Sequence, residues 1–248
     1  GWVMALVQRA AASQKRIDEF LNVKPEITSA SSASVVVAGE IEFKKVSFTY
    51  PSTGIKALKQ ISFIVKKGHR MAVIGRTGSG KSTLGQLLVR MYDPDEGEIL
   101  IDGVNIKSLN LPALRRQVGY VSQDVFLFSD TVFNNIGFGM NVSEMDAESV
   151  KTAATYAVVH QDVLQLPEQY ETVVGERGIT LSGGQKQRIS IARALIKEPQ
   201  ILVFDDCLSA VDAQTEKNIL GYLNDFLQNR TTIIITHRIF SLFNFDQI

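Results

Sequence analysis

The chain of 248 residues, 45% hydrophobic and 21% charged, is long enough for one large globular domain or for a domain with an attached lobe. Lys and Arg (26 residues) balance Asp and Glu (26 residues), which argues against partners recognised through bulk charge, such as nucleic acid. The single cysteine, Cys207, excludes an internal disulfide, and no apolar run reaches the roughly 18–20 residues that span a bilayer.

Residues 3–21 predict an amphipathic helix that becomes more polar toward its end. Apolar residues recur at helical spacing from Leu6 to Leu21, and Pro25 follows the pattern. The next segment, residues 26–39, includes a run of small polar residues and predicts a flexible linker. A helix is therefore expected to precede the main domain and to be joined to it by this linker.

Beyond residue 40 the pattern changes to strands that alternate with helices. Period-two alternation predicts an antiparallel pair of strands first, whereas the later strands are continuous apolar runs that indicate burial on both faces. The expected elements are antiparallel strands 41–50 and 57–65, a buried strand 71–75, a helix 81–92, a mostly helical region of about 125–195, and buried strands 200–204 and 231–236. This order predicts an α/β fold with a mainly parallel sheet.

A glycine-rich segment, GRTGSGKS at residues 75–82, matches the phosphate-binding pattern G-x-x-x-x-G-K-[ST]. The glycines let backbone N–H groups curl around an anion, and the start of the following helix adds its dipole. Lys81 would reach the β- and γ-phosphates, and the Ser82 hydroxyl would ligate Mg²⁺. A glycine-rich turn without a ligand is the alternative, but the strand before the segment and the helix after it are the context that the motif requires. The residues expected to bind nucleotide are Gly75, Arg76, Thr77, Gly78, Ser79, Gly80, Lys81, Ser82 and Thr83.

A second anion-binding pattern, LSGGQ, opens another predicted helix at residues 181–185. A serine and two glycines at a helix start expose backbone N–H groups with little side-chain obstruction. Taken alone, the same letters would describe a serine-capped helix. The residues assigned to this site are Leu181, Ser182, Gly183, Gly184 and Gln185.

Together, these motifs resemble those of ATP-binding cassette (ABC) proteins. The order matches from about residue 40 to the end: Tyr50, the phosphate loop, Gln123 after a strand, LSGGQ, a strand that ends in Asp205, and the THR triplet that begins at Thr236. The resemblance implies a P-loop NTPase (RecA-like) core with an N-terminal antiparallel β subdomain and a helical subdomain. It also implies ATP and Mg²⁺ as ligands.

The resemblance assigns roles to individual side chains. Tyr50 would stack on adenine, and Asp205 would hold Mg²⁺ through water, together with Ser82. Gln123 would touch both Mg²⁺ and the attacking water, and His237 would contact the γ-phosphate. An isolated tyrosine or histidine in these contexts would more often be a packing or surface residue, so the assignment depends on the joint pattern.

The family pairs two such domains head to tail. Each ATP then lies between the phosphate loop of one domain and the LSGGQ signature of the other. A second nucleotide-binding domain is therefore an expected partner, and Ser209 and Asp212 are assigned to the loop that crosses between the two. Nucleotide would control the pairing equilibrium.

Three features favour an exporter-type member of the family. The VVGERG segment at residues 173–178 resembles a short exporter motif, and residues 1–25 resemble the cytoplasmic end of the last transmembrane helix of an exporter. No long heptad insertion separates Gln123 from Leu181, which argues against chromosome-maintenance ATPases. Residues 40–248 would then form the nucleotide-binding domain.

An exporter assignment carries further expectations. The parent protein would place this domain at the cytoplasmic face of a membrane, for example the inner membrane of a bacterium, beside a transmembrane domain of the same chain. The final residues resemble a strand that other members continue with further elements, so the domain is expected to be truncated at its C-terminus. A soluble ABC protein is the alternative.

The second of two adjacent carboxylates, Asp206, departs from the family pattern, in which glutamate is the proposed general base. Aspartate has similar basicity but is about 1.5 Å shorter in reach. We therefore predict tight ATP binding and slow hydrolysis in the site built on this phosphate loop. A heterodimeric exporter whose partner carries the glutamate would explain the departure, whereas a homodimer, compensation by the backbone or a water, and a non-hydrolytic ATP switch stay open.

Overall fold

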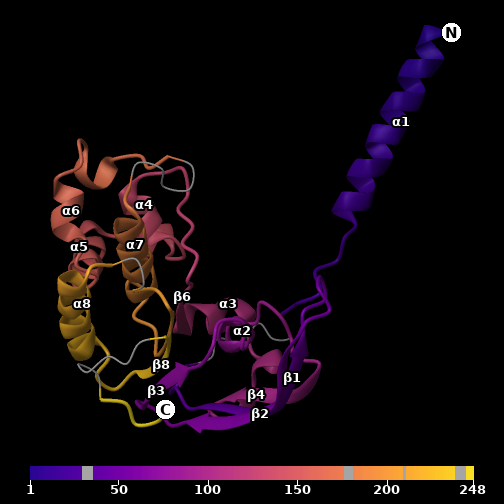
Figure 1. The fold of residues 1–248 in the computed structure, drawn as a ribbon. Helices are drawn as coiled ribbons and strands as arrows, with labels where there is room; N and C mark the ends of the chain where they lie inside the picture. Colours follow the sequence, from indigo (N-terminus) through magenta and orange to yellow (C-terminus); the bar gives the residue numbers. More distant parts are fainter. Residues whose placement is uncertain (30–35, 176–180, 209–210, 238–243) are drawn as a thin grey trace.

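The structure is a computed structural model that describes residues 1–29, 36–175, 181–208, 211–237 and 244–248. Its helices and strands, in chain order, are α1 (Trp2–Leu21), β1 (Ile41–Thr49), β2 (Lys56–Val65), β3 (Arg70–Ile74), α2 (Lys81–Leu88), β4 (Glu96–Ile101), β5 (Val104–Asn105), α3 (Leu111–Gln117), β6 (Val118–Val121), α4 (Val132–Gly137), α5 (Ala147–Tyr156), α6 (His160–Leu164), α7 (Gly183–Leu195), β7 (Ile201–Asp205), α8 (Ala213–Phe226) and β8 (Thr231–Thr236). Figure 1 shows their arrangement.

The early strands form an antiparallel sheet in the order β2-β1-β4-β5. Ile41 of β1 pairs with Val65 of β2 on one side and with Ile101 of β4 on the other. These three side chains are buried, as the alternating pattern of β1 requires. The predicted antiparallel β subdomain is therefore confirmed.

The later strands form a parallel sheet in the order β3-β8-β7-β6. Every residue of β7 and β8 is buried, as expected for parallel strands covered on both faces. Adjacent residues of β7 point into different cores: Leu202 packs with the helical part of the chain, and Val203 packs with the antiparallel sheet and α2. The parallel sheet thus separates two hydrophobic cores, and the predicted α/β class is confirmed.

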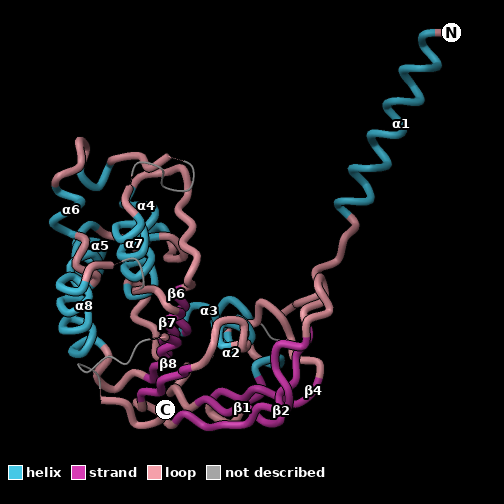
Figure 2. Tube along the Cα trace, viewed as in Figure 1, coloured by secondary structure: helices cyan, strands magenta, loops and turns pink. Residues whose placement is uncertain are grey.

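Helices α4–α8 gather on one side of the molecule, away from the antiparallel sheet, as Figure 2 shows. Contacts of α7 with α4 and α5 hold this group together.

The prediction for the helix after the phosphate loop was too long, because α2 ends at Leu88 rather than continuing to Tyr92. Arg90 adopts a left-handed φ of 50°, which ends the helix, and Met91 is exposed instead of lying on its apolar face.

The N-terminal helix α1 extends away from the rest of the molecule (Figure 1), and none of its residues, all of which are described, is buried. Among the described residues, no helix is both long and apolar enough to cross a bilayer.

The end of the predicted linker is attached to the domain. Val37 is buried, and the backbone N–H groups of Ala38, Gly39 and Glu40 donate to the Asp102 carboxylate. The connection from α1 therefore reaches the domain at a fixed point.

Candidate nucleotide site

The carboxyl ends of four adjacent parallel strands meet at one edge of the sheet. Ile74, which precedes the phosphate loop, pairs with Thr236, which precedes His237. Asp205 at the end of β7 pairs with Ile235, and Phe204 pairs with Val121 of β6. Because ligands of open α/β sheets bind outside the carboxyl ends of the strands, this edge is where a site is expected.

The phosphate loop depends on a glycine at its end. Gly80 is the N-cap of α2 with a φ of 86°, and a Cβ at this position would lie 2.4 Å from the carbonyl oxygen of Ala57. A side chain would therefore push the loop away from β2. The Lys81 ammonium group folds back and donates to the carbonyl oxygens of Gly75 and Arg76, at 2.8 Å each. This contact holds a positive charge over the loop, where a phosphate could accept from it.

The loop opens into a cavity of about 480 Å³. Side chains from all four strand ends reach it, together with Tyr50 from the end of β1. The lining residues are Tyr50, Ile55, Ala57, Thr77, Gly78, Gly80, Lys81, Ser82, Thr83, Gln123, Asp205, Asp206, Ile235 and His237. The fold therefore brings the predicted adenine, phosphate and metal residues into one space, in which a nucleoside triphosphate would have both an aromatic and a cationic partner.

The Asp205 carboxylate lies at the base of this cavity and is only 3% exposed. Burial raises its pKa above the ordinary value, and the negative charge of the nearby Asp206 adds to this rise. Hydrogen bonds from Ser82 and Tyr120 and the positive charge of Lys81 lower the pKa and partly offset the rise. The Tyr120 hydroxyl donates to Oδ2 over 3.2 Å, and burial followed by the Asp205 charge raises the pKa of Tyr120. A buried carboxylate beside a hydroxyl is a favourable environment for a divalent cation, whose positive charge would offset the cost of burying the carboxylate.

These groups fit Mg²⁺ rather than a metal that prefers nitrogen or sulfur. Asp205 and Ser82 offer a carboxylate and a hydroxyl oxygen, and Gln123 adds an amide oxygen to the same cavity. Within the described part of the chain, no three His, Cys, Asp or Glu side chains cluster in a way that could hold a metal. A hard cation shared with phosphate oxygens therefore suits the site best.

Asp206 differs from Asp205 in both exposure and backbone conformation. It is partly exposed in the cavity wall, and its φ of 44° lies in the left-handed region. Its N–H donates to the carbonyl oxygen of Ile235 over 2.9 Å, which ties the residue to β8. The sheet thus directs two successive carboxylates differently, with Asp205 buried and Asp206 nearer to solvent.

Tyr50 is held in place by the helix that follows the phosphate loop. Its hydroxyl shares a hydrogen bond with Thr83 Oγ1 and donates to Gln86 Oε1, both at 2.8 Å. Phe48 and Tyr92 pack edge-on against its ring. The aromatic side chain is therefore oriented before any ligand arrives, which lowers the entropic cost of stacking a base on it.

The LSGGQ segment lies elsewhere, at the start of α7 in the helical part of the molecule (Figure 1). Ser182 caps α7: its hydroxyl accepts from the Gln185 N–H at 3.2 Å, and the Gln185 side chain accepts from the Ser182 N–H at 3.0 Å. Gln185 also donates to Asp162, which forms an ion pair with Arg188 at 2.8 Å. All five residues 181–185 are described, and none of them lines the cavity. The two segments predicted to bind anions therefore lie apart in the chain's fold.

Comparison with known proteins identifies the family of this chain. The family model "ABC transporter" matches residues 58–209. The chain belongs to the ABC transporter family. It is 44% identical over 248 residues to the multidrug resistance-like ATP-binding protein MdlA of Escherichia coli strain K12, and 42% identical over 246 residues to an ATP-dependent lipid A-core flippase of Pseudomonas fluorescens strain Pf0-1.

A solved structure of a bacterial Atm1-family ABC exporter with ATP bound matches 94% of this chain with a TM-score of 0.86 and 39% identity. The alignments with MdlA and the flippase cover 100% and 99% of this chain, but only 42% and 41% of those proteins, and 40% of the exporter chain is covered. The chain thus spans about two fifths of the length of these ABC relatives.

The other positions expected from the ABC pattern are only partly described. Asp212 is the N-cap of α8, where its carboxylate accepts from the N–H groups of Gln214 and Thr215. Ser209 and residues 176–178 of the VVGERG segment lie outside the described residues. The assignment of Ser209 and Asp212 to a loop that crosses between ABC domains stays a prediction.

Two polar residues at the ABC site were missed from the sequence. Gln86 lies three positions after Thr83 on α2, so helical spacing could have suggested that both face Tyr50. Tyr120 gave no such signal, because its partner Asp205 is 85 positions away in the sequence. Only the pairing of β6 with β7 brings these two side chains together.

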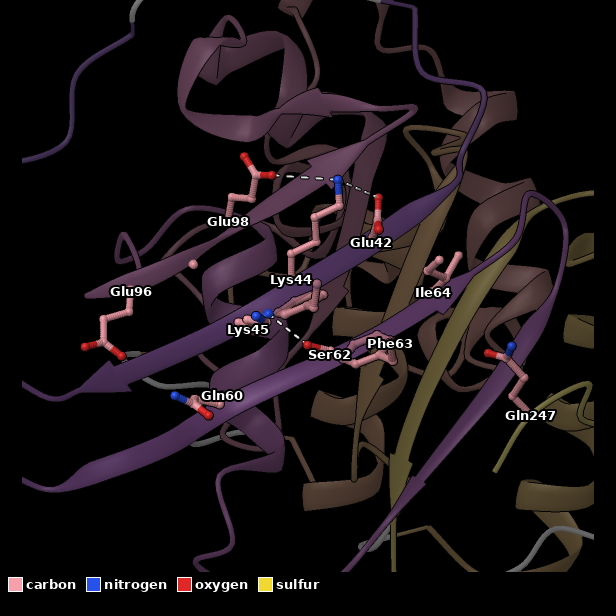
Figure 3. A pocket seen from close by; sticks show the side chains of 12 residues that line it. Glu42, Lys44, Lys45, Gln60, Ser62, Phe63, Ile64, Glu96, Glu98 and Gln247 are labelled. Atoms are coloured by element: carbon pink, nitrogen blue, oxygen red, sulfur yellow. Dashed lines mark hydrogen bonds and ion pairs between the residues drawn. The ribbon is translucent and has the colours of Figure 1, made fainter.

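A separate groove of about 1020 Å³ lies on the antiparallel sheet of this ABC domain and is shown in Figure 3. Lys44 lies between Glu42 and Glu98, at 3.3 and 3.7 Å, and the Lys45 N–H donates to Ser62. The groove therefore carries more negative than positive charge, since three glutamates (Glu42, Glu96 and Glu98) and two lysines (Lys44 and Lys45) line it. The phosphate loop does not contribute to its lining.

Replacing the cap residue Ser182 with alanine is expected to reduce stability without weakening the phosphate loop. Loss of the capping hydrogen bond should lower the free energy of unfolding by about 1 kcal/mol and the melting temperature by about 2–4 °C. Calorimetry would measure the loss of stability. Nucleotide titration of the dilute monomer would check that the affinity for ATP is unchanged. A weaker affinity of the monomer for ATP would contradict the separation of α7 from the cavity.

Proposed function

We propose that this chain is the motor domain of an ABC exporter, which binds ATP and Mg²⁺, pairs head to tail with a second nucleotide-binding domain, and hydrolyses ATP to drive export. The separation of LSGGQ from the cavity is the observation that carries the proposal. The phosphate loop, Gln123, Asp205 and His237 surround one space, whereas residues 181–185 lie outside it. A second domain would bring its own signature to the open side of that space.

The side chains can divide the work in the following way. Tyr50 would stack on adenine, and Lys81 would leave the carbonyl oxygens of Gly75 and Arg76 to donate to the β- and γ-phosphates. Ser82 and Asp205 would hold Mg²⁺, which would supply positive charge to the phosphate oxygens. Gln123 would orient the attacking water, and Asp206 would accept its proton.

Further residues would complete the site in the paired state. His237 lines the same cavity and would contact the γ-phosphate. The partner's signature would present the N–H groups of a helix start to that phosphate. ATP would therefore join the two domains, and hydrolysis would release them.

The placement at a membrane is part of the proposal. The relatives include a protein named a lipid A-core flippase and a structure named an ABC exporter, and the matched part is about two fifths of each. The exposed helix α1 would continue from a transmembrane domain of the parent chain at the cytoplasmic face. Five of its exposed large apolar residues (Trp2, Val3, Met4, Leu6 and Val7) lie in its first turns, which is compatible with a helix that leaves a bilayer, although Ile17, Phe20 and Leu21 near its end are exposed as well.

Asp206 supports a second candidate, a subunit that binds ATP as a switch and hardly hydrolyses it. In that case the partner would carry a glutamate at the matching position, and the intact LSGGQ of this chain would complete the partner's ATP site. Single-turnover measurement of ADP formation separates the candidates. A motor with a weakened base releases ADP slowly from its own site, whereas a switch retains ATP through the whole measurement.

A mixing experiment tests the head-to-tail site. Lys81→Met removes the phosphate loop's ammonium group, and Ser182→Arg places a bulky side chain at the signature. Each variant alone should lose ATP-driven dimerisation and turnover, because both sites of each dimer are damaged. An equal mixture should recover about one quarter of the wild-type turnover, because half of the dimers are mixed and each has one intact site. A mixture as inactive as its components would contradict a site shared between two chains.

A further inference from the structure

Tyr120 connects the site to a strand that carries none of the assigned residues. It lies on β6 and pairs with Val203 of β7, two residues before Asp205. Its hydroxyl extends past Val203 and donates to Asp205 Oδ2 over 3.2 Å. Together with the bond from Ser82, this places a buried carboxylate between hydroxyl groups from two different elements.

The space for the Tyr120 ring exists because α2 carries a glycine. A Cβ at Gly85 would lie 2.7 Å from Tyr120 Cε2 and 3.1 Å from Val203 Cγ1. Real side-chain atoms do not approach so closely, so any other residue at Gly85 would displace the ring or the helix. The phenol is therefore confined between the backbone of α2 and strand β7, with its hydroxyl directed at Asp205.

This confinement restricts Asp205 as well. A carboxylate that is 3% exposed cannot turn to water, so its orientation follows from its hydrogen-bond donors. Ser82 is itself an assigned ligand of Mg²⁺ and would have to share its oxygen with the metal. Tyr120 lines no part of the cavity and would keep its hydrogen bond when the site is occupied.

We propose that Tyr120 is a positioning residue that holds the Asp205 carboxylate in the orientation needed for Mg²⁺, and that Gly85 is required because it leaves room for the ring. Hydrogen bonds to metal-binding carboxylates orient them, and their loss usually weakens metal binding. The inference rests on the proposed function, since it needs a nucleotide and its Mg²⁺ in this cavity. It adds a residue from β6 to the site.

The test compares the affinity of the dilute chain for a non-hydrolysable ATP analogue, adenylyl imidodiphosphate, with Mg²⁺ and with EDTA. The ratio of the two dissociation constants measures how much Mg²⁺ strengthens binding. Tyr120→Phe keeps the ring beside Gly85 and removes only the hydroxyl, so the fold should be retained. We expect it to reduce the Mg²⁺-dependent gain about 10-fold while leaving the affinity in EDTA unchanged.

Two further variants separate positioning from a structural role. Gly85→Ala should lower the Mg²⁺-dependent gain in the same direction, because the added methyl group displaces the ring. Tyr170→Phe removes a hydroxyl that bonds His160 at 2.7 Å in the helical part, and it should leave the gain unchanged. A melting temperature close to that of the wild type confirms that each protein is folded.

The outcomes are distinct. A folded Tyr120→Phe protein with an unchanged or larger Mg²⁺-dependent gain would overturn the role of Tyr120. Equal losses of affinity with Mg²⁺ and with EDTA would also overturn it, because they would indicate general damage to the cavity. A wild-type chain that binds the analogue neither with Mg²⁺ nor with EDTA would contradict the proposed function instead.

Discussion

Replacing Asp206 with glutamate is expected to raise the rate of ATP hydrolysis by the paired domains about 100-fold. A general base must come within roughly 2.6–3.2 Å of the water that it activates, and a misplacement of about 1 Å can cost on the order of 100-fold. Asp206 lines the cavity beside Asp205, but it is one methylene shorter than the glutamate of the family pattern. The added methylene should restore contact with the attacking water.

The same substitution should make the domain less stable. Asp206 has a φ of 44°, and aspartate adopts this left-handed region more readily than glutamate does. We expect a loss of roughly 1 kcal/mol, or about 2–4 °C in melting temperature. The gain in turnover and the loss in stability would therefore occur together, and steady-state ATPase assays with calorimetry would measure both.

Two control variants distinguish an improved general base at position 206 from an unspecific effect of the substitution on the domain. Asp206→Asn removes the base and should abolish the remaining turnover while ATP binding persists. Asp225→Glu makes the same chemical change at an exposed position on α8 and should alter neither the ATP turnover nor the melting temperature. If Asp206→Glu left turnover at the wild-type rate, the length of this side chain would not limit hydrolysis.

Replacing Lys81 with methionine is expected to weaken ATP binding about 100-fold. Lys81 Nζ donates two hydrogen bonds at 2.8 Å to loop carbonyl oxygens, so it is already positioned over the place where phosphate would lie. Each hydrogen bond to a charged group contributes about 1.5–3 kcal/mol, so two bonds to phosphate account for about 3 kcal/mol or more. Methionine preserves most of the aliphatic stem and removes the charge.

Fluorescent-nucleotide titration of the dilute chain would measure this loss. Lys44→Met serves as the matched control, because it removes the same group from β1, where it contacts Glu42 and Glu98 outside the nucleotide cavity. Its affinity for ATP should equal that of the wild type. Tight binding by the Lys81→Met protein would place the triphosphate somewhere other than the phosphate loop.

The sequence predicted the site residues that belong to contiguous motifs. A phosphate loop is a local structure, because successive backbone N–H groups and the helix that begins at Lys81 make it within eight residues. The apolar runs that precede Asp205 and His237 also identify buried parallel strands without further information. The α/β class and the cavity residues at the strand ends could therefore be predicted, although their roles in catalysis stay to be tested.

The limits of that prediction are visible in particular residues. Helical spacing suggested that Met91 belongs to α2, but the left-handed φ of Arg90 ends the helix earlier. Nothing near Tyr120 in the sequence indicates a carboxylate partner, and nothing near Gly85 indicates a ring beside it. These contacts join α2, β6 and β7.

The sequence by itself thus predicted which segments are candidates to bind anions and determined which strands are buried, because backbone geometry and hydrophobic periodicity are local properties. Only the tertiary structure decided that LSGGQ lies outside the cavity and that Tyr120 reaches Asp205 past Gly85. The physical reason is that periodicity tells which face of an element is buried but not which element covers it. Packing between segments far apart in the chain decides which element covers that face. At Gly85, for example, the absence of a Cβ leaves room for the Tyr120 ring.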